Sequence, residues 1–179
     1  VSMGSLLGAT YRPAKIQCTI PYRKDAAEYE EHFAKLLLLQ PEHVKFKLGK
    51  NLDLESKMIV RFRELAPSVG ISVDANQAFA TAESAQDFLA KVSSAGLCWA
   101  EQMLPREDVD AWKQLKKIAS VPLMADESIH TAREARWYLE NGLVDFINIK
   151  LAKAGGVLEA RKIFSLAEEY RVPAMLGSM

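Results

Sequence analysis

Two patterns of apolar and polar positions alternate along the chain, a short apolar run and a longer amphipathic stretch. Residues 15–21 alternate, with Ile16, Cys18 and Ile20 on one face, and predict a strand; residues 25–38 predict the helix after it. The pair recurs about every 25 residues. Six more strands are predicted at 44–48, 71–74, 97–101, 122–125, 144–150 and 173–176. Five more helices are predicted at 53–66, 82–94 (capped by Thr81), 109–118, from a cap at Thr131 to about Glu140, and 157–170.

Seven strands that alternate with six helices predict parallel βαβ units, because each crossover between parallel strands needs a connection of this length. Two parallel α/β architectures compete, an open doubly wound sheet and an eight-stranded barrel. No G-x-G-x-x-G follows the first predicted strand, so the dinucleotide-binding form of the open sheet loses support.

Composition narrows the classes of function. The 23 basic and 23 acidic residues leave a formal net charge of zero, which argues against a nucleic-acid-binding protein. No apolar run is long enough to predict a membrane span, and no signal peptide is visible. Cys18 and Cys98 form no metal-binding pattern and suit the reducing cytoplasm, where we expect both to be buried.

Five successive predicted strands each end in charged residues. In chain order these ends are Lys45-Phe46-Lys47, Asp74-Ala75-Asn76, Glu101, Asp126-Glu127 and Asn148-Ile149-Lys150. Counted from Lys47, the intervals are 27, 27, 25 and 24 residues, which is one βα unit each. The active site of a (β/α)8 barrel is assembled from the carboxyl ends of its strands, so this register predicts a barrel with one polar mouth.

The types of residue at this mouth predict a chemistry. Asp74, Glu101 and Asp126 offer three hard oxygen ligands, which suit Mg²⁺ better than zinc. Such an ion neutralises the charge of an enediolate that forms when a proton next to a carboxylate is removed. Lys47 and Lys150, four strands apart, are expected on opposite sides of the mouth, with Lys45 placed to lower the pKa of Lys47. A lysine on each side of one carbon predicts racemisation or epimerisation.

Each motif alone has an ordinary structural interpretation. K-x-K is usually a strand edge with solvated amines, D-A-N is a plausible turn or N-cap, and D-E-S is a plausible entry to a helix. The ordered set is what carries the hypothesis.

The motifs K-x-K, D-A-N, A-E-Q, A-D-E-S and N-I-K-L-x-K-x-G-G, in this order, resemble the barrel domain of the enolase superfamily over residues 6–179. The lysine at the end of the sixth strand is similar to that of the muconate-lactonising subgroup. The resemblance implies Mg²⁺ (Mn²⁺ as an alternative) on Asp74, Glu101 and Asp126, and an acid/base pair of Lys47 and Lys150. It further implies contacts to a small-molecule carboxylate substrate from Lys45 and Ser178, with Asn76 and Glu127 supporting the site from behind.

The resemblance also implies an amino-terminal capping α+β domain and an eighth βα unit, neither of which this sequence shows. An eight-stranded barrel takes about 250 residues. We therefore expect part of a longer protein, with residues 1–14 a linker from the capping domain and residues 15–179 an incomplete barrel of seven strands.

Within the family, P-L-M-A-D-E-S, D-F-I-N-I-K-L-A-K-A-G-G and M-L-G-S-M most resemble the dipeptide epimerases, which act on L-Ala-D/L-Glu-like dipeptides. Muconate cycloisomerase, o-succinylbenzoate synthase and N-acylamino-acid racemase use the same lysines and metal and stay open as alternatives. The alternative of another class is a non-catalytic metal-binding barrel. The resemblance further implies a homo-oligomer, a dimer or an octamer.

Overall fold

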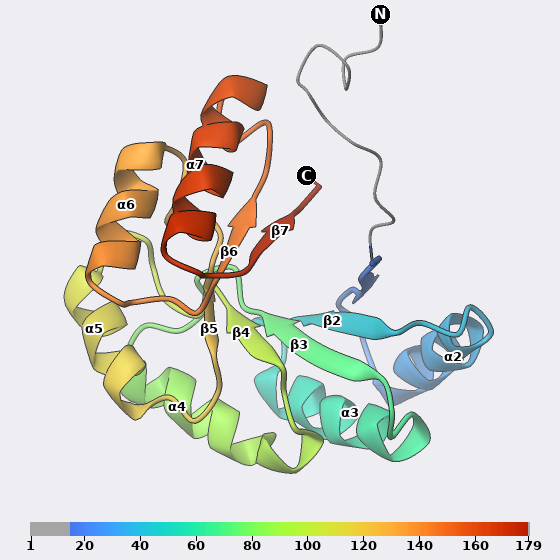
Figure 1. Ribbon diagram of the computed structural model, residues 1–179. Coiled ribbons are helices and arrows are strands. Elements are labelled where there is room, and N and C mark those ends of the chain that lie inside the picture. The colour runs from blue at the N-terminus through green and yellow to red at the C-terminus, as the bar shows by residue number, and fades with distance from the viewer. Residues whose placement is uncertain (1–14, 179) are drawn as a thin grey trace, which may run out of the picture.

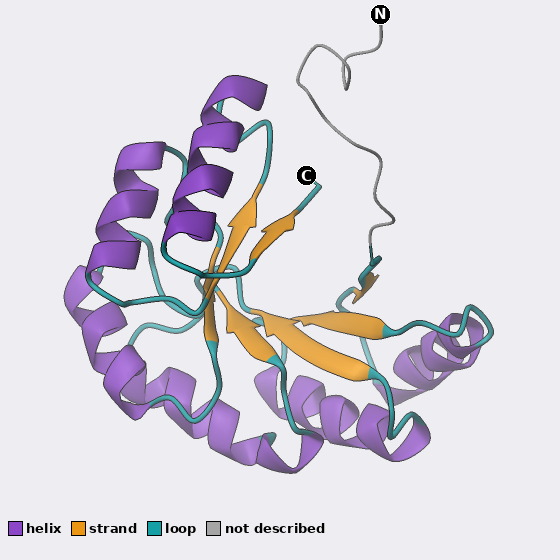
Figure 2. Cartoon of the chain, viewed as in Figure 1, coloured by secondary structure: helices purple, strands orange, loops and turns teal. Residues whose placement is uncertain are grey.

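One parallel sheet with helices on one side of it makes up the computed structural model, which describes residues 15–178. The sheet curls, and its helices cover the convex side (Figures 1 and 2). The strands lie in chain order: β1 (Cys18–Ile20), β2 (His43–Lys47), β3 (Gly70–Asp74), β4 (Trp99–Glu101), β5 (Leu123–Ala125), β6 (Phe146–Ile149) and β7 (Ala174–Leu176). The helices are α2 (Ala26–Leu37), α3 (Leu52–Leu65), α4 (Ala82–Lys91), α5 (Val109–Ile118), α6 (Ala132–Glu140) and α7 (Val157–Glu169). This confirms the predicted α/β class and seven strands of a TIM (β/α)8-type barrel.

Capping side chains explain why some helices begin where the sequence predicts. Asp108 accepts a hydrogen bond from Ala111 N at the start of α5. Thr131 and Glu134 form a reciprocal capping box at the start of α6. The end of α4 differs, because the helix stops at Lys91 and a short 3₁₀ helix follows it. Strand β1 is shorter than predicted, since its pairing with β2 covers only three residues.

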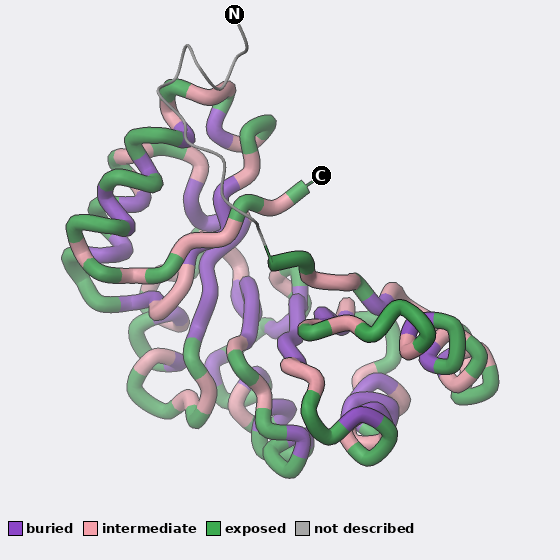
Figure 3. Tube along the Cα trace, turned by 45° about the vertical axis from the view of Figure 1, so that its right-hand side comes forward, coloured by how far each residue is buried: buried purple, intermediate pink, exposed green. Residues whose placement is uncertain are grey.

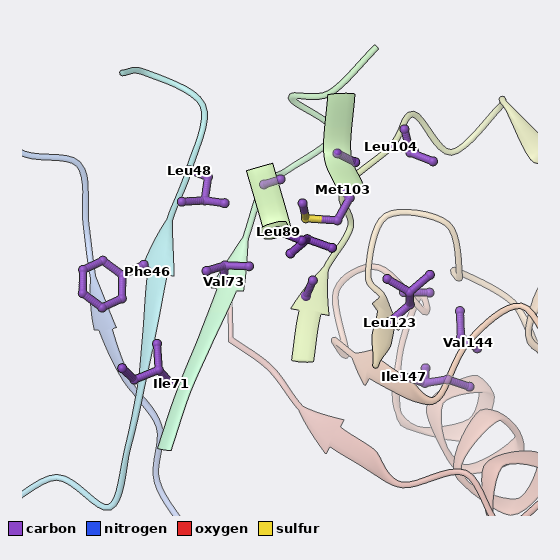
Figure 4. Packing of buried hydrophobic residues seen from close by; sticks show 14 of the residues in the cluster. Phe46, Leu48, Ile71, Val73, Leu89, Met103, Leu104, Leu123, Val144 and Ile147 are labelled. Carbon is purple, nitrogen blue, oxygen red and sulfur yellow. The ribbon is translucent and has the colours of Figure 1, made fainter. Parts of the chain in front are cut away.

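The main hydrophobic core lies between the convex face of the sheet and the helices. Phe46 of β2 meets Phe33 of α2 and Phe62 of α3, with ring centroids 5.9 and 5.7 Å away, both nearly edge to face. Figure 4 shows the same layer continuing along the sheet through aliphatic side chains such as Val73 and Ile147. In Figure 3 the strands are largely buried, while the outward sides of the helices are exposed. This core determines which side chains of each strand face the helices.

The concave face differs between its two ends. Residues two apart on β2 share this face, so His43 lies at the amino end and Lys45 and Lys47 follow toward the carboxyl end. The His43 ring stacks on Trp99, with centroids 4.4 Å apart, and shares a hydrogen bond with Ser72 Oγ. The aromatic layer therefore supports the amino end, and the charged groups gather at the other.

The prediction that both cysteines are buried is wrong. Cys98 is exposed and Cys18 is half-buried. Cys98 precedes β4, which begins at Trp99, so it lies in the connection before the strand and outside the core. The predicted linker at residues 1–14 lies outside the described residues. No helix between residues 15 and 178 is both long and apolar enough to cross a membrane.

The stacked histidine should make the stability depend on pH. Burial, followed by the charge of Lys45, lowers the pKa of His43 to about 4, whereas the unfolded chain binds that proton near pH 6.5. The contribution of the neutral His43 to the free energy of unfolding is therefore fully present above pH 6.5 and is lost as the pH falls toward 4. After allowance for partial exposure, the loss should be about 1–2 kcal/mol. Urea unfolding of the full-length protein and of His43→Gln at pH 7 and pH 4.5 checks this. Equal losses in both proteins would contradict it.

Candidate active site

Three carboxylates converge at the carboxyl end of the sheet. The register places Lys47 of β2 opposite Asp74 of β3, and Asp74 opposite Glu101 of β4. Asp126 follows the last residue of β5. One oxygen from each of Asp74, Glu101 and Asp126 lies within 4.8 Å of the others, and all three residues are fully buried. The structure thus brings the three predicted metal ligands together.

Lysine ammonium groups surround these carboxylates. Lys45 Nζ lies 2.8 Å from Glu101 Oε2 and 3.3 Å from Asp74 Oδ2. Lys47 Nζ donates to Asp74 Oδ2 at 2.6 Å, while Lys150 Nζ donates to Asp126 Oδ2. The two predicted acid/base lysines therefore contact different carboxylates, on the β3 and β5 sides of the cluster.

Burial and charge pull the pKa values of the cluster in different directions. Burial, followed by the charge of Asp74, raises the pKa of Glu101 to about 7. Burial also acts to raise the pKa of Asp126, but the ammonium groups of Lys153 and Lys150 outweigh it and hold that pKa below its usual value. For Lys45, burial is outweighed by the charges of Glu101 and Asp74, so its pKa is raised. The ammonium of Lys45 is accordingly a stable positive charge.

A cavity of about 510 Å³ opens beside the cluster. Its lining brings together all four predicted substrate-facing residues from β2, the turn after β6 and the segment after β7: Lys45, Lys47, Lys150 and Ser178. That last segment approaches β6 closely, so a Cβ at Gly177 would overlap Asn148 Oδ1 and push that side chain aside. Ser178 is exposed and lies where the described chain reaches the cavity.

Asn76 and Glu127 form a short chain of hydrogen bonds that starts at Lys47. Asn76 Oδ1 accepts a hydrogen bond from Lys47 Nζ at 2.6 Å, and Asn76 Nδ2 donates to Glu127 Oε1 at 2.8 Å. Asn76 has a left-handed φ of 42°, which turns the chain sharply after Asp74. The pair links the turn after β3 to the turn after β5.

Three residues of the site had no role assigned from sequence. Asn148 Nδ2 donates to Glu101 Oε1 at 2.7 Å. Gln102 Oε1 accepts from the backbone N–H of Asp126, and Lys153 Nζ lies 2.8 Å from Asp126 Oδ1. All three are letters of the motifs A-E-Q and N-I-K-L-x-K, so their positions were visible in the sequence although their contacts were not.

The donor set fits a small divalent cation. All three groups are carboxylates, the hard oxygen donors that Mg²⁺ and Mn²⁺ prefer. Asp126 Oδ1 is buried and lies 2.8 Å from the ammonium of Lys153. A carboxylate oxygen has two lone pairs, so one is left for a metal ion. His32, His43 and His130 all lie outside this group of possible ligands.

Comparison with known proteins gives a consistent family. The family model "Enolase C-terminal domain-like" matches residues 26–179. The L-Ala-D/L-Glu epimerase of Bacillus subtilis is 39% identical over 142 residues, covering 76% of this chain and 38% of its own. The crystal structure of N-succinyl Arg/Lys racemase from Bacillus cereus superimposes with a TM-score of 0.89 at 27% identity, over 98% of this chain and 48% of that one. The crystal structure of 2-chloromuconate cycloisomerase from Rhodococcus opacus superimposes with a TM-score of 0.87 at 28% identity, over 96% of this chain and 48% of that one. The chain thus spans less than half the length of these relatives.

The buried ion pairs generate a prediction about stability. Replacing Lys45 by Met leaves Glu101 buried without its ammonium partner, which should cost about 3 kcal/mol of unfolding free energy. The double variant Lys45→Met/Glu101→Gln should recover part of that loss, because no charge is left unpaired. Urea unfolding of the full-length protein in the presence of a chelator measures both. Lys35→Met, which breaks the exposed pair with Glu31, is the matched control and should change little. A loss as small as that of the control would contradict the prediction.

Proposed function

Because this chain belongs to the family of enolase C-terminal domain-like proteins, we propose that its full-length protein is a Mg²⁺-dependent isomerase that removes and returns a proton next to a carboxylate. The observation that carries the proposal is the placement of Lys47 and Lys150. Both line one cavity, and each contacts a different member of the buried carboxylate cluster.

The carboxylates and Lys45 would bind the reacting end of the substrate. Asp74, Glu101 and Asp126 would hold the Mg²⁺ ion. When bound, the ion would neutralise the negative charge that develops on the substrate carboxylate as its α-proton leaves. Lys45 stays positively charged beside Glu101 and reaches the cavity, so it would attract the same carboxylate and orient it.

The two other lysines would move the proton. One lysine, as the neutral amine, would take the proton from one face of the α-carbon. The other, as the ammonium, would return a proton to the opposite face, so that the configuration inverts. Lys47 donates to Asp74 and Asn76, and Lys150 donates to Asp126, so different carboxylates would hold the two amines apart.

We propose a dipeptide epimerase as the specific activity. Support comes from the 39% identical relative, an L-Ala-D/L-Glu epimerase. An N-acylamino-acid racemase, an o-succinylbenzoate synthase and a muconate cycloisomerase remain alternatives, since the same lysines and carboxylates would serve them. A non-catalytic metal-binding barrel would not need Lys47 and Lys150 in the cavity. We further propose a cytoplasmic homo-oligomer whose remaining length includes a capping domain and an eighth βα unit.

Isotope exchange tests the proposal. The full-length protein, with Mg²⁺ in D₂O, should place deuterium at the α-carbon of dipeptides and leave N-succinyl amino acids and muconate unchanged, as read by mass spectrometry and NMR. Exchange in another pool would keep the chemistry and reassign the substrate. Exchange in none would contradict the proposed function.

Single lysine variants test the two-base scheme. Lys47→Ala and Lys150→Ala should each lower the epimerisation rate by at least about 10²-fold. Each variant should still exchange the α-proton of the one stereoisomer that faces its remaining lysine. Lys50→Ala, outside the cavity lining, is the control and should keep the normal rate. Normal epimerisation in either site variant would rule out the scheme.

A further inference from the structure

Asp126 differs from the other two carboxylates in how its backbone is held. Asp74 and Glu101 are the last residues of their strands, and their carbonyl oxygens accept from Leu48 N and Ala75 N of the neighbouring chain segments. Asp126 lies one residue beyond the end of β5. Its backbone therefore takes partners outside the ladder. The carbonyl oxygen accepts from Ile129 N in the following turn at 3.1 Å, and side chains supply the other partners.

Gln102 provides the first of these side chains. The residue is fully buried, and its Oε1 accepts from the backbone N–H groups of Asp126 at 2.9 Å and Ser128 at 3.2 Å. Its Nε2 donates to Ser128 Oγ at 2.8 Å and to Leu104 O at 3.0 Å. Gln102 has a left-handed φ of 40°, and its backbone carbonyl accepts from Gln77 N rather than from Asp126 N. The side-chain amide thus takes the place of a main-chain acceptor for Asp126.

Lys153 provides the second. Its side chain is 9% exposed, and its Nζ donates to three main-chain carbonyls: Asp126 O, Ile129 O at 2.9 Å and Asn148 O at 3.1 Å. A lysine has three N–H donors, so these carbonyls use all of them. The same Nζ also lies 2.8 Å from Asp126 Oδ1, so its charge acts on the carboxylate as well as on the backbone. The ammonium ties the turn after β5 to β6.

The geometry points to Gln102 and Lys153 as a clamp on Asp126, two positioning residues that fix this carboxylate as a metal ligand. Gln102 holds its N–H, Lys153 holds its C=O, and the Lys153 charge restrains Oδ1. With both backbone groups fixed, the direction of the Cα–Cβ bond is fixed as well. The inference rests on the proposed metal site. It adds two residues that are not themselves metal ligands.

A rigid ligand should favour one ion over another. Mg²⁺ demands nearly ideal octahedral geometry at about 2.0–2.1 Å, whereas Ca²⁺ accepts flexible arrangements at about 2.3–2.6 Å. Outer partners of a metal ligand typically change affinity by about 10–100-fold. Loosening the clamp should therefore weaken Mg²⁺ binding more than Ca²⁺ binding.

The test compares Gln102→Met and Lys153→Met with matched controls in the full-length protein. Gln77→Met removes an amide that accepts from Arg106 N without touching Asp126, and Lys162→Met removes an exposed lysine paired with Glu159. Calorimetric titration gives the Kd values of Mg²⁺ and Ca²⁺. Hydrogen exchange gives the protection of the Asp126 and Ser128 amides. The ratio of the two affinities is used because a lost positive charge, or a general loss of stability, acts on both ions alike.

Both clamp variants should lower the preference for Mg²⁺ over Ca²⁺ by about 10-fold or more, and Gln102→Met should speed exchange at Asp126 and Ser128. The controls should do neither. Unchanged exchange in Gln102→Met overturns the clamp, and faster exchange with an unchanged ion ratio overturns its effect on the metal. Wild-type protein that binds neither ion contradicts the proposed function, and the exchange data then decide the clamp alone. If Gln102→Met does not fold, Ser128→Ala, which removes one of the four hydrogen bonds of the amide, takes its place.

Discussion

The structure depends on the electrostatic problem of burying three carboxylates at one end of a parallel sheet. Asp74, Glu101 and Asp126 are withdrawn from water and lie close enough to repel one another. Burying a charge without a partner is strongly unfavourable, so the fold must supply positive charge at the same place. Four lysines supply this charge. Lys45 and Lys47 come from β2, and Lys150 and Lys153 come from the turn after β6. The pairing that makes the cluster tolerable is also what brings amines to the cavity.

The order of these groups along the chain follows from the βα repeat, which is why so much of the site was predictable. A parallel sheet in chain order places successive strand ends side by side, so equal spacing in sequence becomes proximity in space. Lys47, Asp74 and Glu101 are paired directly in the observed register. Helix starts were predictable for a related reason, because caps such as Thr131 act on backbone only three residues away.

Contacts that depend on the approach of distant side chains were not predictable in the same way. Gln102 and Lys153 are ordinary polar residues in sequence, and either would suit a solvated turn. Their partners are fixed only by the left-handed φ at Gln102 and by the depth at which the Lys153 ammonium is buried. The prediction that Cys98 is buried was wrong for the opposite reason. Its apolar side chain suggested a place in the core, but β4 begins one residue later, at Trp99.

The alternation of side chains along β2 connects stability with chemistry. Phe46 points to the helices and joins the aromatic core, while Lys45 and Lys47 point to the cluster, so the strand cannot shift by one residue without exchanging the two sets. Such a shift would place lysines in the apolar layer and Phe46 among the carboxylates. The hydrophobic core therefore fixes the register, and the register in turn sets the level at which Lys47 meets Asp74. Beyond β5 the ladder no longer provides this control, and the backbone of the last carboxylate residue is held by side chains together with the turn contact from Ile129 N.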